Sequence, residues 1–321
     1  MEASIITADF ISGLLASSLA MAIPLLLAGL GEVFLERSGV LNMGLEGMIL
    51  FGCFICFMAA HYSGSTYVGL LMAVLFGLLA GLFMGLLTLK MLTHQSITGI
   101  VFNFFALGVT GFFNRYILGA TLFPPRIDIL PTIRIPLLAD IPIVGFIFQQ
   151  NFVAYFALLL VPIAAFVLFR TNFGLKIRAV GGNAQAADTM GIDAIRMRYL
   201  MWMLCGVMAS LAGAYLTATI GIFSDGMSSY RGFIVIALVV FARWKPALIL
   251  FGALLFGFAD ALQLRLQALG AGALGIVIPF QFLIMLPYVL TIIVLIVAAK
   301  FRYVNPSVVG RPYIRAGKEL M

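Results

Sequence analysis

The chain is poor in charge, histidine and cysteine. Only 10% of its 321 residues are charged, two are histidine and three are cysteine. A soluble domain needs far more polar residues to cover its core, so this composition argues against a soluble fold. A strand-like alternation of apolar and polar residues is also missing, which argues against a membrane β-barrel.

The few thiols and imidazoles indicate no metal or redox site. Cys53 and Cys56 form a C-x-x-C pair, but both lie inside an apolar run, where thiols behave as small hydrophobic side chains. His61 and His94 stand alone. The G-x-x-x-x-G-K-[ST] phosphate loop and the H-E-x-x-H and G-x-S-x-G motifs are missing. We therefore expect no catalytic residue, no metal and no cofactor bound by this chain.

Hydrophobic residues make up 63% of the chain, and the mean hydropathy is +1.16. Several apolar runs exceed the roughly 18 residues that indicate a bilayer crossing. Backbone polar groups in lipid must pair internally, so these runs predict helices. The fold class is therefore all-α, a polytopic transmembrane helix bundle that we take as one domain over residues 1–321. We expect spans at 11–30, 43–60, 66–89, 97–117, 152–169, 199–219, 231–242, 246–263 and 276–299.

One of the nine expected spans is too short. Residues 231–242 cannot cross a hydrocarbon core of about 30 Å, and a longer helix would bury Asp225 and Arg231. A broken helix beside a solute path explains this, since irregular backbone is tolerated where it lines a cavity. The number of spans is accordingly eight to ten.

The net charge of +7 reflects membrane topology rather than nucleic-acid binding. Nine crossings with the N-terminus outside and the C-terminus in the cytoplasm place most basic residues on the cytoplasmic side of the plasma (inner) membrane. Glu2 and Asp9 precede the first apolar run and no Lys or Arg does, unlike the basic start of a cleaved signal peptide, so we expect this run to stay as a span. The cytoplasmic group contains Arg37, Lys90, Arg170, Lys176, Arg178, Arg196, Arg198, Arg243, Lys245, Lys300, Arg302, Arg311, Arg315 and Lys318.

Two further stretches carry structural predictions. Residues 66–89 have a small residue at every fourth position, from Gly69 to Gly85, which predicts tight helix packing. Residues 120–151 are rich in proline, which favours extended structure and turns on the outer side. That segment either covers the outer mouth or meets a partner, or it is an ordinary loop.

The cytoplasmic segment 171–198 predicts a short helix between two membrane helices. Gly181 and Gly182 break the chain, and Asn183 is a good N-cap. Residues 184–190 are alanine-rich and favour helix. Gly191 ends the helix in the left-handed conformation. Such a helix is either a handle for a cytoplasmic partner or an amphipathic turn on lipid headgroups.

The same segment resembles the coupling loop of permeases from binding-protein-dependent ATP-binding-cassette (ABC) importers, in the branch for branched-chain amino acids, ribose-type sugars and nucleosides. Two other stretches resemble that family: 38–47, reading SGVLNMGLEG, and 231–246, with RGFI and FARWKP. They are most similar to nucleoside or simple-sugar permeases served by basic-membrane-protein-type lipoproteins. The coupling-loop pattern is matched by Gly174, Arg178, Ala179, Gly181, Asn183, Ala186, Ala187, Gly191 and Ile192.

The resemblance implies a division of labour. The chain would be the permease subunit of an ATP-driven importer for a small polar solute, and not an enzyme. ATP and Mg would be bound by separate ATP-binding cassette subunits. The other implied partners are a second permease, identical or a paralogue, and an extracytoplasmic solute-binding protein or lipoprotein. A secondary transporter driven by an ion gradient is the alternative function.

Polar residues inside the expected spans are candidates for the solute path. Glu46 and Asp260 are the carboxylates, and Asn42 lies one turn before Glu46. Amides and carboxylates hydrogen-bond sugar hydroxyls or a nucleobase edge, and aromatic rings stack on them. The alternative is that these residues bond helices together or pin the start of the second helix. The remaining candidates are Asn103, Phe104, Phe280 and Gln281.

Overall fold

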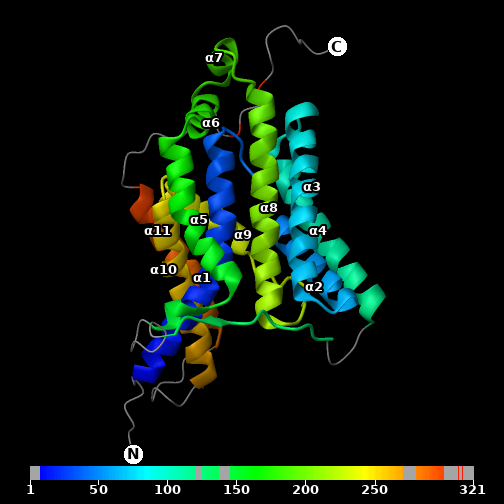
Figure 1. Cartoon of the computed structure of the whole chain (residues 1–321), viewed down its shortest axis with the longest axis vertical. Coiled ribbons are helices and arrows are strands. Elements are labelled where there is room, and N and C mark those ends of the chain that lie inside the picture. The colour runs from blue at the N-terminus through cyan, green and yellow to red at the C-terminus, as the bar shows by residue number, and fades with distance from the viewer. Residues whose placement is uncertain are drawn as a thin grey trace, which may run out of the picture.

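The computed structural model describes residues 8–119, 125–136, 145–269 and 280–299, with Gly310 and Tyr313. Long helices lie side by side in an elongated bundle, with α6 and α7 at one end (Figure 1). The helices are α1 Ala8–Arg37, α2 Leu45–Ser63, α3 Thr66–Gly85 continued by the π-helix η1 Leu86–Lys90, α4 Gln95–Leu118, α5 Phe152–Arg170, α6 Asn172–Gly182, α7 Ala184–Thr189, α8 Ala194–Ile220, α9 Arg231–Phe241, α10 Pro246–Leu269 and α11 Phe280–Ala299.

Seven helices in the described ranges are long and apolar enough to span a membrane. They correspond to seven of the nine expected spans, and the prediction of a polytopic helical bundle is confirmed. The expected span at 231–242 is the eleven-residue α9, which covers only about 16 Å. The ninth corresponds to α11, apart from 276–279, which lie outside the described residues.

Helix α8 lies at the centre of the bundle, packed against α1, α2 and α3. In the spanning stretches of α2 and α8, 72% and 67% of residues are buried, against 22% in α4. The small-residue stripe of α3 explains part of this contact, because Gly77 and Gly81 meet the backbone of Gly206 and Trp202. The predicted tight packing of residues 66–89 is confirmed.

The proline-rich segment crosses the end of the bundle opposite α7. Ile127 and Leu130 donate backbone hydrogen bonds to the carbonyls of Gly221 and Ala218 at the end of α8, at 2.9 and 3.0 Å. Strand β1 Ile133–Arg134 pairs with β2 Gln149–Gln150, and the 3-10 helix η2 Gly145–Phe148 precedes β2. The extended structure expected here is therefore present in the described parts, and it covers the α8 end.

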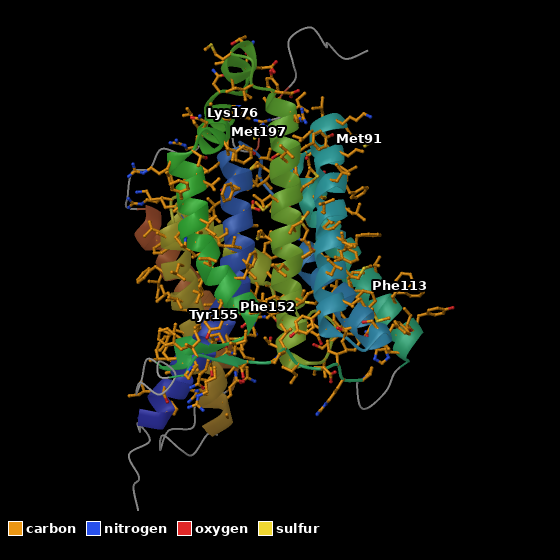
Figure 2. All side chains as sticks on the ribbon, viewed as in Figure 1. Met91, Phe113, Phe152, Tyr155, Lys176 and Met197 are labelled. Atoms are coloured by element: carbon orange, nitrogen blue, oxygen red, sulfur yellow. The ribbon has the colours of Figure 1, made fainter. Side chains whose placement is uncertain are left out.

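Several basic side chains lie at the α7 end of the bundle. Figure 2 shows Lys176, Met197 and Met91 at the α7 end, and Phe152 and Tyr155 at the other. At the α7 end, Arg37 and Arg178 lie over the ring of Phe169, 5.7 and 5.6 Å from its centroid. The predicted clustering of basic residues agrees with this arrangement, while the side of the membrane that this end faces stays a prediction.

Candidate functional site

The segment 171–198 forms a small scaffold of two helices at one end of the bundle. Thr171 caps α6, with its hydroxyl accepting from the Gly174 backbone N–H at 3.2 Å. The sequence predicted a break in the chain at Gly181 and Gly182. Both glycines instead form the last turn of α6. A Cβ on Gly181 would overlap the Arg37 carbonyl, so this glycine allows α6 to lie against the end of α1.

Helix α7 has the two ends that the sequence predicts. The Asn183 side chain accepts from the Ala186 N–H at 3.0 Å, as an N-cap does. Gly191 has φ +82° and donates to Asp188, while Ile192 donates to Ala187, both at 3.0 Å. This pair of hydrogen bonds is a Schellman motif, which satisfies the last carbonyls of the helix. The helix at 184–189 is therefore confirmed, and its coupling role stays a prediction.

Only part of the coupling pattern faces outward. Gly174, Gly181 and Ala187 are buried, and Arg178 donates to the Gly174 carbonyl at 3.4 Å. Ala187 is 5% exposed and packs inside this chain, and its part in coupling stays a prediction. Five of the exposed residues of the segment lie on α7 or directly beside it, and we call them the α7 tip: Asn183, Gln185, Ala186, Thr189 and Met190.

The scaffold connects directly to the membrane helices. The Arg37 guanidinium donates to the carbonyls of Arg243 and Trp244, in the turn between α9 and α10. Arg198, at the start of α8, donates to the Ser38 carbonyl at 3.1 Å. A displacement of α6 against Arg37 would thus reach α1, α9 and α10 together.

Residues 38–44 form an irregular, largely buried segment between α1 and α2, which we call the first break. Side chains pair its backbone groups, as a non-aqueous environment requires. Glu32 accepts from the Asn42 N–H at 3.1 Å, and Gln95 accepts from the Leu41 N–H at 2.9 Å. Asn42 accepts from the Gly44 N–H at 2.8 Å. Asn42 therefore pins the start of α2, one of the alternatives left open by the sequence.

Asn103 of α4 also holds the start of α2 in place. Its side-chain oxygen accepts from the Gly47 N–H, and its nitrogen donates to the Met43 carbonyl, both at 2.8 Å. Phe104, the next residue, is 71% exposed, whereas Asn103 bonds the backbone of residues 43 and 47. The two candidate residues are thus not brought together, and Asn103 serves the backbone of α2.

Residues 221–230 form a second break, before α9. Glu46 of α2 accepts from the Tyr230 and Gly232 N–H groups at 2.8 and 2.7 Å. A carboxylate at a helix N-terminus complements the helix dipole and its unpaired N–H groups. The starts of α2 and α9 therefore meet inside the bundle, and Glu46 joins them.

Two more polar contacts hold the second break. Asp225 forms an ion pair with Arg115 of α4 at 2.9 Å and accepts from Asn114 at 3.2 Å. Arg231, at the start of α9, lies 3.7 Å from Asp260 of α10. Asp260 therefore has a partner that the sequence analysis did not identify, and both side chains line a cavity.

The candidate path residues do not converge on one site. Gln281 is exposed on α11, and the side chain of Phe280 lies outside the described residues. The cavity residues Gln263 and Gln267 were missed. Their spacing from Asp260 at three and seven residues places all three on one face of α10, a signal present in the sequence.

The chain belongs to a known permease family. The profile described as "Branched-chain amino acid transport system / permease component" matches residues 14–299. A putative glucose ABC transporter permease, TsgC13 of Haloferax volcanii, is 36% identical, covering 96% of this chain and 99% of its own length. The guanosine ABC transporter permease NupQ of Bacillus subtilis is also 36% identical, covering 96% and 98%. The nucleoside ABC transporter permease NupC of Lactococcus lactis is 34% identical, covering 94% and 97%.

No solved structure has a significant match to the chain. The family assignment therefore depends on sequence similarity over nearly the full length. It agrees with the resemblance stated from the three motifs, and it makes the chain a multi-pass membrane permease.

Proposed function

We propose that the chain is the membrane-spanning subunit of an ATP-driven importer, with ATP and Mg bound by a separate cassette subunit that docks on the α7 tip. The observation that carries this proposal is the α6–α7 scaffold, which presents a short capped helix outside the bundle. The position of the basic residues supports a cytoplasmic α7 end, an outer N-terminus and a cytoplasmic C-terminus at the plasma membrane.

The scaffold suggests how docking would move the membrane helices. Closure of the cassette subunits would push α7 and α6 against Arg37, since Gly181 lies directly on the Arg37 backbone. Arg37 bonds the α9–α10 turn, and Glu46 bonds the start of α9. The push would therefore reach both breaks, where helices can change their relative position as rigid bodies.

The solute is a nucleoside or a simple sugar. This proposal is supported by the names of the relatives, which are a putative glucose, a guanosine and a nucleoside ABC transporter permease. A second permease subunit and an extracytoplasmic solute-binding lipoprotein complete the assembly that such a family member needs. A gradient-driven carrier is less well supported, because one of its two candidate coupling carboxylates, Glu46, accepts hydrogen bonds from two backbone N–H groups of this chain.

The test is uptake by the complete transporter in proteoliposomes. We expect uptake of radiolabelled guanosine or glucose that requires ATP on the cassette side and the solute-binding protein on the other. An imposed sodium or proton gradient without ATP should give none. Gradient-driven uptake in the absence of ATP would contradict the proposal and favour the secondary transporter.

A further inference from the structure

A cavity of about 330 Å³ lies between α9, α10 and α11. This volume is in the range of small-molecule sites. Its lining combines apolar side chains, including Ile234 and Leu264, with several polar ones. The polar lining consists of Ser229, Arg231, Asp260, Gln263, Gln267 and Tyr288.

The hydrogen-bonding capacity of this lining is only partly used within the described part of the chain. The Arg231 Nη1 donates to the carbonyls of Met227 and Ser228, while its buried Nε has no acceptor there. The Nε2 of Gln267 is likewise buried without an acceptor. At 3.7 Å the Arg231–Asp260 contact is too long for a direct hydrogen bond. Buried donors without acceptors are costly, so the lining is suited to a molecule that accepts from them.

We propose that this cavity binds the vicinal hydroxyl groups of a ribose or hexose ring. Asp260 offers only acceptors, Arg231 offers only donors, and Gln267 offers both. A hydroxyl group donates one hydrogen bond and accepts others, so two adjacent hydroxyls match this set. The ring of Tyr288 and the apolar side chains provide a surface for the C–H face of the sugar. The assignment rests on the proposed function, and it concerns a group that nucleosides and simple sugars share.

The depth of the cavity fits a translocation path. Asp260 lies fourteen residues into α10, which starts at the α7 end, so it is about 20 Å along the helix from that end. Arg231 begins the broken helix α9, whose N-terminus is held by Glu46. A solute in the cavity would therefore contact the element that the second break allows to move.

The experiment uses thiol labelling of the complete transporter. The native cysteines Cys53, Cys56 and Cys205 are buried, so a Leu264→Cys variant reports on the cavity. A polar thiol reagent is applied with and without guanosine or glucose, in nucleotide-free and vanadate-trapped complexes. Tyr62→Cys, at the exposed end of α2, is the matched control.

We expect guanosine or glucose to slow labelling at Leu264→Cys in at least one of the two states, and not at Tyr62→Cys. Each 2-deoxy analogue should need a roughly tenfold higher concentration for the same protection. Added to Leu264→Cys, Gln267→Leu or Asp260→Asn should raise the half-protecting concentration of the parent solute about tenfold. When the Asp260→Asn variant is tested with a 2-deoxy solute, the increase in half-protecting concentration should be smaller than the product of the two separate increases. The reason is that both changes remove the same contact.

The possible outcomes distinguish failure of the cavity assignment from failure of the proposed importer function. Wild-type ATP-driven uptake without protection at Leu264→Cys in either state, or with equal protection at Tyr62→Cys, overturns the cavity assignment alone. Equal protection by the parent and 2-deoxy solutes overturns the recognition of vicinal hydroxyls. Absence of ATP-driven uptake of both solutes by the wild type contradicts the proposed function, and the cavity assignment falls with it. Should Asp260→Asn fail to assemble, Gln267→Leu gives the test, because this change leaves the Arg231–Asp260 ion pair in place.

Discussion

The two breaks in the bundle are held in different ways. The first, at 38–44, is largely buried, and the amides of Asn42, Gln95 and Asn103, with Glu32, satisfy its backbone groups. The second, at 221–230, is more exposed and tied by carboxylates to α2, α4 and α10. It also contains Ser229 and Tyr230 at φ +49° and +60°, a strained conformation for residues other than glycine.

We infer from this difference that the first break is a fixed part of the bundle and that the second break moves during transport. Side chains pair several backbone groups of the buried first break, so opening it would leave these polar groups unsatisfied. An exposed ion pair can exchange one of its partners for water at a smaller cost in free energy. We therefore expect damage at the first break to reduce stability, and damage at the second to reduce transport in a folded protein.

The largest expected effect is that of Asn103→Leu. It removes the acceptor of the Gly47 N–H and the donor to the Met43 carbonyl, so we expect a loss of about 2–3 kcal/mol of stability. Thermal unfolding of the purified protein in detergent measures it. Phe104→Leu is the adjacent control and should be nearly neutral, since Phe104 is exposed. Normal stability with reduced uptake in Asn103→Leu would show that Asn103 contacts the solute instead.

Glu46→Leu should have an intermediate effect of a different kind. Loss of the carboxylate releases the Tyr230 and Gly232 N–H groups and costs about 1–2 kcal/mol. The protein should remain folded, and ATP-driven uptake should fall well below the wild-type rate. Glu46→Gln keeps an acceptor and should retain part of the uptake. An equal loss of thermal stability in Glu46→Leu and Asn103→Leu would contradict the proposed difference between the two breaks.

The smallest effect is expected for the exposed ion pair between Arg115 and Asp225. The Arg115 side chain is 74% exposed, so its ion pair with Asp225 contributes at most about 0.5 kcal/mol after solvent screening. Arg115→Ala should leave thermal stability unchanged, because Asn114 still donates to Asp225. Unfolding in high salt should match that of the wild type. A large loss of stability would mean that the second break is as rigid as the first.

Local signals in the sequence predicted much of this structure. Long apolar runs define the membrane helices, and Asn183 and Gly191 define both ends of α7, because capping depends on neighbouring residues. Helix α6 was missed because Gly181 appeared to be a breaker, whereas it is helical and its missing side chain lets α6 lie against Arg37. That contact joins residues 144 positions apart and has no local signature.

The partners of the polar residues could not be predicted for the same reason. Glu46 was recognised as costly in a span, but its bonds reach Gly232, 186 residues away. The orientation of Ala187 also depends on how α7 docks on the bundle. The face of α10 that carries Asp260, Gln263 and Gln267 has helical spacing, so this part of the cavity was accessible from the sequence.

The most direct test of the account concerns the α7 tip. Ala186 is exposed and Gly191 has positive φ, so Ala186→Trp should block docking and Gly191→Val should distort the end of the helix. The measurement is pull-down of the cassette subunit together with solute-stimulated ATP turnover in proteoliposomes. We expect both to be lost, with normal membrane insertion, while Ile129→Trp in the exposed proline-rich segment keeps both. Wild-type attachment and turnover in both α7 variants would contradict the coupling role of this helix.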